Sequence, residues 1–381
     1  MKQKRALEQI GGPIRTEGRA DVLAEAWARA SDEDPDTLTH GFHPWPARMH
    51  PAIARVVLAA ARPRTMLDPF CGAGTSMIEA RVAGVEAVGI DLSPLARRVA
   101  SVKLDARDAA GRRRFEQTAA TVAAASEARV RAREPIHVDL PKHELAWFGG
   151  HVIKELGGLR EEIRASGPRE DRHALAMVFS SILIKVSRQR SETHIERHDR
   201  RIRKGLATEL FLRKARELSA RWAELERVAR GPMPELLEGD ARRLFRLLGD
   251  RRFDVILTSP PYGGTYDYAD HHARRFAWLE LDDERLRRFE IGARRRSGHD
   301  DAAQRWDEDV GAMLAAMESV LSPRGDVILV IGDGRFGDRV VEAPAQLRRL
   351  APEAGLEVVG VASQPRHGGR EEHLVRLKRR D

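Results

Sequence analysis

The sequence predicts an α/β fold in which a mostly parallel sheet is interrupted by a helical insertion. Three observations support this prediction: strand and helix patterns alternate from Met66 onward, the strand pattern disappears between residues 106 and 231, and two strands close the chain. Strands that alternate with helices are typical of parallel sheets with crossover helices. The last two strands are joined by a polar connection of about nine residues, which is short enough for an antiparallel pair.

The chain divides at the points where this pattern changes. Residues 1–40 are polar, are acidic around Ser31–Asp36, and are predicted to form a helix followed by a loose lead-in. Residues 41–105 and 232–381 carry the alternating strands and helices and are predicted to fold together as one domain. Residues 106–231 are predicted to be an inserted helical region.

Short apolar runs mark the individual elements. The predicted strands are 65–70, 85–91, 234–240, 253–262, 326–334, 356–363 and 373–379. Helical spacing predicts the connecting helices 74–84 and 306–321. In the insertion, alanine, arginine and glutamate recur at helical spacing through 112–133, 152–163 and 206–230.

The composition excludes several function classes. The single cysteine, Cys71, excludes an intramolecular disulfide and any multi-thiolate metal site built from this chain alone. No run approaches the roughly 18 uninterrupted apolar residues of a membrane span. The first twelve residues, MKQKRALEQIGG, lack the apolar run of a secretory signal, so we expect a cytoplasmic location.

The net charge of +8 and the pI near 9.9 suit a polyanionic partner. Basic side chains that neutralise phosphates release condensed counterions and bind without regard to sequence. A GC-rich coding sequence would also produce an excess of arginine and alanine without selection for binding. Both explanations of the net charge stay open at this stage.

Three acidic residues follow predicted strands and are candidates to bind a ligand. Asp68 opens a glycine-rich turn, Leu67–Thr75, that leads into a helix whose N-terminus offers unpaired N–H donors. The turn departs from the dinucleotide-binding pattern because Met77 stands where the third glycine would fall, and Asp68 suits a cationic amino group. Asp91 is placed to accept hydrogen bonds from ribose hydroxyls, and Asp240 is placed to accept one from an adenine amine. Each alone fits a helix cap or turn, but together they are predicted to line one crevice.

Two motifs carry a resemblance to the S-adenosylmethionine-dependent amino-methyltransferases. DPFCGAGT at 68–75 is similar to motif I of that family, and TSPPY at 258–262 is similar to motif IV. HGFHPWPARMHP at 40–51 resembles the family's motif X segment, and DLSPLA follows from Asp91. The resemblance covers 41–103 and 234–381 and extends to the insertion only loosely.

The resemblance implies a fold, a cofactor and a set of residues that bind it. The implied fold is a Rossmann-like, seven-stranded methyltransferase sheet with an antiparallel C-terminal hairpin, and the implied cofactor is S-adenosylmethionine. The predicted cofactor-binding residues are Asp68, Phe70, Gly72, Gly74, Thr75, Asp91 and Asp240. No metal and no covalent intermediate are needed, because the sulfonium is already an activated methyl donor.

The chemistry of methyl transfer to a base amine explains the residue types of TSPPY. Such an amine is a poor nucleophile because its lone pair is delocalised, and acceptors for its protons favour the tetrahedral transition state. The resemblance implies Ser259 Oγ and the Pro260 carbonyl as these acceptors. Pro260 and Pro261 stiffen the turn, and Tyr262 is predicted to stack on a base that has been flipped out of the duplex.

The target base is predicted from the first position of the motif. A serine there, Ser259, is the family's usual variant for cytosine N4, so the resemblance implies DNA as partner and cytosine-N4 methylation as activity. Alternatives are adenine-N6 methylation of DNA, an RNA methyltransferase of the tRNA guanine-N2 type, and a DNA-binding module that has lost catalysis. A restriction endonuclease is a further candidate partner. TSPPY read alone also fits an ordinary proline-rich turn.

A basic segment, Lys185–Lys204, carries eight Lys or Arg residues against three acids. A solvated, salt-bridged helix face would have the same composition. Because the family often places target recognition between motifs I and IV, the segment is predicted to contact DNA. The predicted substrate-binding residues are Arg200, Arg201, Arg203 and Tyr266. Further phosphate contacts are predicted for Arg274, Arg275, Arg294, Arg295 and Arg296.

Five histidines invite other interpretations. His40, His43 and His50 have a spacing that fits no common zinc pattern, so no metal site is expected. His271 and His272 are predicted either to lie near the mouth of the crevice or to be solvated.

Overall fold

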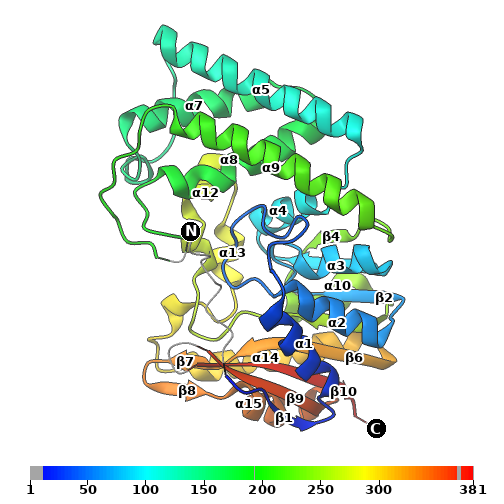
Figure 1. Ribbon diagram of the computed structural model, residues 1–381. Coiled ribbons are helices and arrows are strands. Elements are labelled where there is room, and N and C mark those ends of the chain that lie inside the picture. The colour runs from blue at the N-terminus through cyan, green and yellow to red at the C-terminus, as the bar shows by residue number, and fades with distance from the viewer. Residues whose placement is uncertain (1–11, 193, 367–369, 381) are drawn as a thin grey trace.

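The structure is a computed structural model, and it describes residues 12–192, 194–366 and 370–380. Its centre is a sheet with the strand order β1-β9-β10-β6-β5-β2-β3-β4 (Figure 1). The strands of this sheet are β1 (Arg15–Gly18), β2 (Thr65–Asp68), β3 (Glu86–Asp91), β4 (Glu235–Glu238), β5 (Phe253–Thr258), β6 (Leu321–Gly332), β9 (Leu356–Arg366) and β10 (Arg370–Arg379). A separate pair consists of β7 (Gly334–Phe336) and β8 (Arg339–Val341).

The strand directions confirm the predicted fold class. Strands β4, β3, β2, β5 and β6 are parallel to one another. Strand β10 runs antiparallel between β6 and β9, as the short connection between the last two strands requires. The eighth strand, β1, pairs antiparallel with β9 and was not predicted, because its four residues are polar and exposed.

Helices cover both faces of the sheet. Alternate residues of the central strands enter different cores: Met66, Val255 and Leu257 pack toward the face covered by the first set of helices, while Leu67 and Ile256 pack toward the other. The first set is α1 (Asp21–Asp32), α2 (Pro51–Ala61) and α3 (Thr75–Ala83). The second set is η1 (Ala241–Arg243), α10 (Leu244–Leu248), α14 (Ala302–Val320), α15 (Ala343–Leu350) and η3 (Ala351–Ala354).

A helical layer lies beyond the β4 edge of the sheet, at the top of Figure 1. It packs on α4 (Pro94–Leu104), which follows β3. Its members are α5 (Ala109–Ala132), α6 (Lys142–Leu145), α7 (Gly150–Ala165), α8 (Arg169–Val186) and α9 (Leu206–Val228). The sequence did not predict α8 as a separate helix. The apolar residues of α8 are spread around most of its circumference, which leaves little helical periodicity to detect.

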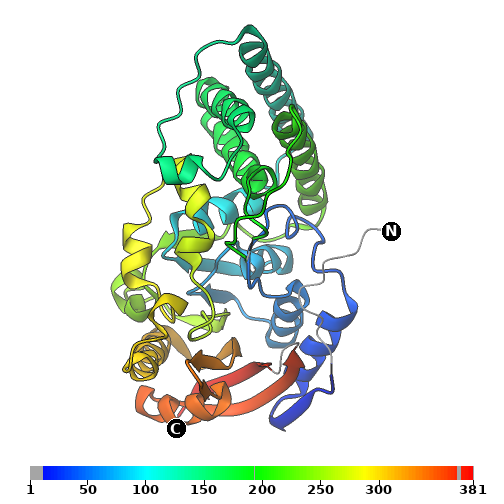
Figure 2. The same cartoon turned by 90° about the vertical axis from the view of Figure 1, so that its left-hand side faces the viewer.

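Two further segments flank the carboxyl ends of the parallel strands. One precedes α2 and contains Thr39–His50; the other joins β5 to α14. The two segments meet where the ring of Trp45 stacks on that of His272, and Figure 2 shows the second segment in yellow. The helices of the second segment are α11 (Tyr268–His271), α12 (Ala273–Leu279), α13 (Glu284–Phe289) and η2 (Arg294–Arg296).

Candidate active site

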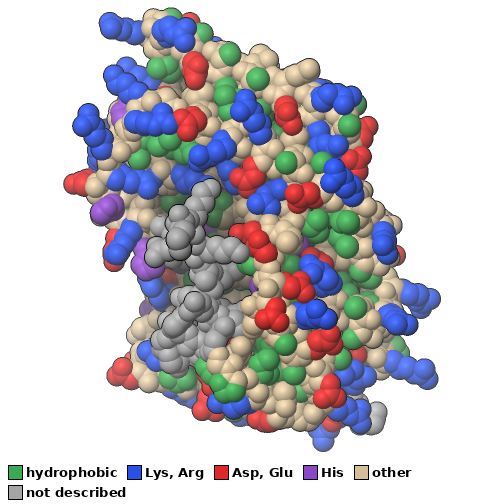
Figure 3. Space-filling model, viewed as in Figure 1, with side chains coloured by type: hydrophobic (Ala, Val, Ile, Leu, Met, Phe, Trp, Pro, Cys, Tyr) green, Lys and Arg blue, Asp and Glu red, His purple; other side chains and the backbone are tan. Residues whose placement is uncertain are grey.

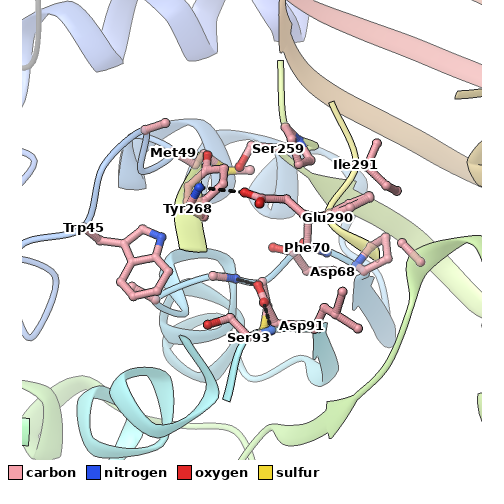
Figure 4. A pocket seen from close by; sticks show the side chains of 18 of the residues that line it. Trp45, Met49, Asp68, Phe70, Asp91, Ser93, Ser259, Tyr268, Glu290 and Ile291 are labelled. Carbon is pink, nitrogen blue, oxygen red and sulfur yellow. Dashed lines mark hydrogen bonds between the residues drawn. The ribbon is translucent and has the colours of Figure 1, made fainter. Parts of the chain in front are cut away.

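A pocket opens at the carboxyl ends of four neighbouring strands (Figure 4). Each strand end contributes a side chain to it: Asp68 from β2, Asp91 from β3, Asp240 after β4 and Ser259 after β5. Parallel strands bring these residues together although 191 positions separate the first from the last.

Most of the predicted site residues line this one pocket. The predicted residues outside the lining are Gly74, Pro260, Tyr262, Tyr266, Arg200, Arg201 and Arg203. The ligand-binding role of every predicted residue stays a prediction. The predicted residues that line the pocket are Asp68, Phe70, Gly72, Thr75, Asp91, Asp240, Ser259 and Pro261.

The glycine-rich turn needs its glycines for two different reasons. Gly72 and Gly74 both have positive φ, +50° and +85°, which L side chains rarely adopt. At Gly74 a side chain would also crowd α4, since a Cβ there would lie 3.0 Å from Ala100 Cβ. At Gly72 the nearest atom is Trp45 Nε1, at 3.4 Å from a Cβ. The turn therefore lets the tryptophan and any bound ligand approach its backbone closely.

Asp68 ties the glycine-rich turn to the TSPPY turn. Its Oδ1 accepts hydrogen bonds from Thr258 Oγ1 at 2.6 Å and from the Phe70 amide at 3.0 Å. Its Oδ2 accepts from the Ser76 hydroxyl on α3. Burial raises the pKa of this carboxyl to about 6, although the three hydrogen bonds oppose the shift, and nearby Asp91 adds to it. The two motifs are thus joined through one buried carboxylate.

Asp91 and Asp240 differ in their charge environment. Asp91 accepts from the Gly72 amide at 2.9 Å and the Ser93 amide at 2.7 Å, and burial raises its pKa. Each of its oxygens retains a lone pair for a ligand. Burial also acts on Asp240, but hydrogen bonds from Arg242, the shortest 2.7 Å, outweigh it and lower the pKa. Asp240 is therefore held as an anion that can accept from an amine.

The outer wall of the pocket comes from residues that the sequence did not single out. Trp45 and Met49 belong to the segment before α2, and Tyr268, Glu290 and Ile291 to the segment after β5 (Figure 4). The buried Glu290 carboxylate accepts from the Tyr268 amide at 2.6 Å and from Arg295 at 2.5 Å. Burial raises the pKa of Glu290 despite these contacts.

The TSPPY turn sits at the edge of the pocket. Ser259 and Pro261 line it, and Pro260 is buried between them. The Tyr262 hydroxyl donates to Glu372 on β10, and its ring packs against Gly332, where a Cβ would lie 2.7 Å from Tyr262 Cδ2. Tyr262 therefore lies beside the pocket with its ring fixed by β6 and β10.

The first three histidines hold loops together. His40 Nε2 pairs with Glu79 at 2.8 Å, and His43 Nε2 with Ser180 Oγ at 3.0 Å. His50 caps α2 by accepting from the Ala52 amide at 3.2 Å. Within the described residues, no group of three or more His, Cys, Asp or Glu side chains is arranged to hold a metal ion.

Two of the predicted phosphate contacts are wrong. Arg274 and Arg275 are buried, because each guanidinium pairs with an acid far away in the sequence: Arg274 with Glu144 at 3.1 Å, and Arg275 with Glu192 at 2.8 Å. A guanidinium that is desolvated and paired in this way is not presented to a phosphate. The prediction that His271 and His272 could be solvated is also wrong, since both are buried.

The other predicted DNA-contacting arginines are exposed. Arg200, Arg201 and Arg203 lie in the loop between α8 and α9, and Figure 3 shows Lys, Arg and His side chains along the left edge of the helical layer. Arg203 pairs with Glu209, and Arg200 donates to the Ile184 carbonyl at 3.2 Å. Arg294 and Arg296 are exposed as well, whereas Arg295 bridges Asp267 and Glu290.

Tyr266 lies next to the pocket, half-buried in an aromatic cluster. Its ring centroid is 5.7 Å from that of Tyr268, which lines the pocket, and 6.0 Å from that of His271.

Known proteins similar to this chain are methyltransferases. It is 25% identical over 277 residues to the type II methyltransferase M.MvaI of Kocuria varians, which covers 65% of this chain and 59% of that protein. It is 23% identical over 262 residues to the type II methyltransferase M.BsoBI of Geobacillus stearothermophilus. That alignment covers 58% of this chain and 48% of that protein. The chain thus spans about half the length of the curated relatives it matches. No protein-family model matches the sequence.

Solved structures resemble the chain more distantly. TrmN from Thermus thermophilus aligns with a TM-score of 0.34 and 16% identity over 87% of this chain and 49% of that one. The rRNA methyltransferase aviRa from Streptomyces viridochromogenes aligns with a TM-score of 0.34 and 13% identity over 88% of both chains. Among the described residues, no helix has the length and apolar character to cross a membrane.

Proposed function

We propose that this protein transfers a methyl group from S-adenosylmethionine to an exocyclic amine of a DNA base, with cytosine N4 as the acceptor. The observation that carries the proposal is the shared pocket of the two motif turns. Asp68 of the glycine-rich turn accepts from Thr258, and the next residue, Ser259, lines the same pocket as Gly72 and Asp91. A donor and an acceptor bound in one pocket can react directly.

The residues of the pocket fit the cofactor. S-adenosylmethionine, when bound, supplies an activated methyl group on a positively charged sulfur. Asp68, Asp91 and Glu290 face the pocket with pKa values raised by burial, and a cationic ligand stabilises their ionised forms. Apolar side chains beside them, including Phe70 and Ile291, suit the flat face of an adenine. Asp240, which stays anionic, is placed to accept from the adenine amine.

The chain's own residues would activate the amine by accepting its hydrogen bonds. Ser259 Oγ is available at the pocket, and the prolines on its C-terminal side keep the turn stiff. An acceptor fixed in a partly buried site favours the developing positive charge on nitrogen more than a mobile water does. Tyr262 and Tyr266 flank this position as stacking surfaces for the flipped base.

DNA as the target follows from two observations. The loop between α8 and α9 exposes Arg200, Arg201 and Arg203, which suit a phosphate backbone. The relatives with detectable sequence similarity are type II methyltransferases. A restriction endonuclease that recognises the same DNA site is the partner that this assignment implies.

The test is methylation of DNA by the purified protein with labelled S-adenosylmethionine, followed by nucleoside analysis. We expect N4-methylcytosine in wild-type reactions and a loss of about 100-fold in rate for Ser259→Ala, as when one aimed hydrogen-bond partner is removed from an active site. Ser319→Ala, on α14, is the matched control. N6-methyladenine in the DNA, or methylated guanine in tRNA with unmodified DNA, would replace the proposed substrate.

A further inference from the structure

A buried guanidinium is among the groups that hold the loop between α8 and α9, residues 187–205, together with backbone contacts such as the Arg188 amide to the Trp147 carbonyl at 2.7 Å. Arg275 on α12 has no exposed surface, and its Nη2 donates to both carboxylate oxygens of Glu192 in the loop, at 2.9 and 2.8 Å. Its Nε donates to the Ser180 carbonyl on α8 at 3.3 Å. Charge-assisted hydrogen bonds to both oxygens of one carboxylate restrict the geometry of both partners. The position of Glu192 within the loop is therefore tied to α12.

The same guanidinium reaches the pocket wall through a histidine. Arg275 Nη1 donates to His272 Nδ1 at 3.1 Å, which places the proton of the neutral ring on Nε2. Burial and the charge of Arg275 hold the pKa of His272 well below its usual value, so the ring stays neutral. The His272 ring stacks on Trp45, with 4.4 Å between centroids and 28° between planes. Trp45 lines the pocket and faces Gly72.

A second route leads from α8 to the same tryptophan. Ser180, whose carbonyl binds Arg275, also pairs through its Oγ with His43 Nε2 at 3.0 Å. His43 Nδ1 donates to the carbonyl oxygen of Pro44 at 2.9 Å, and Trp45 is the next residue. Trp45 is thus held by ring stacking on one side and through its backbone on the other.

We propose that Arg275 is a positioning residue that couples engagement of the loop 187–205 by the target strand to the placement of Trp45 at the cofactor pocket. The identity of the strand as DNA rests on the proposed function, whereas the contacts that carry the coupling lie within the chain. Glu192 is the point of attachment: it is one of three acids among eight basic residues in Lys185–Lys204, and its carboxylate faces Arg275. A strand that moves the loop moves Glu192 and, through Arg275, His272.

Loop protection against trypsin tests this coupling without DNA. S-adenosylmethionine is expected to slow cleavage within 187–205 by about fivefold or more in the wild-type protein, the lower end of typical coupling between sites. In Glu192→Gln the protection is expected to fall below about twofold, with cofactor affinity by calorimetry within about threefold of wild type. Arg275→Lys, which keeps the charge but loses the fork of donors, is expected to fall between them. Arg164→Gln, which breaks the exposed pair with Glu280 at the end of the same helix, is the control.

Single-turnover methylation supplies the second readout. Glu192→Gln is expected to lower the methyl-transfer rate about tenfold while the DNA dissociation constant changes less than about threefold, because the loop keeps its cations but no longer positions Trp45. A purely structural role would instead lower the free energy of unfolding and change both constants together. Should Glu192→Gln fail to fold, Arg275→Lys carries both measurements.

The outcomes separate the coupling from the proposed activity. Equal loop protection in wild type and Glu192→Gln overturns the coupling, whether or not DNA is methylated. Protection that disappears in Glu192→Gln, in a protein that leaves DNA unmodified, supports the coupling and overturns the DNA substrate. A wild-type protein that does not bind S-adenosylmethionine overturns both.

Discussion

The floor and the wall of the pocket are held together in different ways. The floor consists of the turns after β2, β3, β4 and β5, where neighbouring strand ends share short polar contacts such as Thr258 to Asp68 and Gly72 to Asp91. The wall consists of Trp45, Met49, Tyr268, Glu290 and Ile291, which come from two segments far apart in the sequence that meet where Trp45 stacks on His272. The floor is therefore part of the fold, whereas side chains of the wall can be substituted without disturbing the sheet.

Asp68→Ala should produce the largest effect, because it breaks the floor at the contact between the two motifs. The change leaves the Thr258 and Ser76 hydroxyls and the Phe70 amide without an acceptor in a buried site. We expect a loss of about 3 kcal/mol in the free energy of unfolding and a loss of about 100-fold in cofactor affinity. Urea denaturation and calorimetry measure these quantities.

The control for this change is Asp250→Ala, which removes an exposed acid from the loop after α10. Its unfolding free energy should stay within about 0.5 kcal/mol of wild type. If Asp68→Ala behaved like this control, the floor would not depend on the bridge between its motifs.

Arg201→Ala with Arg203→Ala should affect DNA and spare both floor and wall. Two phosphate contacts fewer should weaken DNA binding about tenfold and reduce the slope of log affinity against log salt by about two. Cofactor affinity without DNA should not change. Fluorescence titration at several salt concentrations gives the slope, and Arg216→Ala with Arg227→Ala on α9 removes the same charge elsewhere. An unchanged slope would remove the loop from the DNA site.

Trp45→Ala should change the wall alone. The indole packs between the ring of His272 and the turn at Gly72, so its loss should raise the cofactor dissociation constant about fivefold through lost stacking and burial. Calorimetry with S-adenosylmethionine measures this constant, and Trp45→Phe should recover most of the affinity. A loss of affinity as large as that of Asp68→Ala would erase the distinction between wall and floor.

A pH dependence that originates in the floor is also expected. Because burial raises the pKa of folded Asp68 to about 6, the folded chain keeps a proton that the unfolded chain has already lost between about pH 4 and 6. This group therefore lowers the free energy of unfolding as the pH rises through that window and adds no further change above it. Urea denaturation of wild type and Asp68→Asn at pH 4.5 and 7 should show this difference, and parallel pH profiles would exclude it.

The floor could be predicted from sequence because its signals are local. An apolar strand followed by an acid or by Ser-Pro-Pro places that residue at the carboxyl edge of a parallel sheet, whatever the rest of the chain does. Asp68, Asp91, Asp240 and Ser259 all reach the pocket for this reason. The same reasoning gave the seven predicted strands, each of which overlaps a strand of the structure.

The wall could not be predicted because its contacts depend on distant partners. Glu290 lies in a charged segment without apolar periodicity, and Trp45 meets His272 across 227 positions. Arg274 and Arg275 have the composition of a phosphate site, and only the fold brings Glu144 and Glu192 to them. A basic pair in a sequence does not reveal whether an acid elsewhere will bury it.

The pairing of β1 with β9 has a consequence for how copies of this chain behave toward one another. Residues Arg15–Gly18 cover the backbone of Gly360–Ser363, on the last long strand at that side of the sheet. Without them, this row of N–H and C=O groups would become an open edge, which is a template for strand addition. Truncation past Gly18 is therefore expected to cause self-association through β9 while the pocket, at the opposite half of the sheet, stays intact.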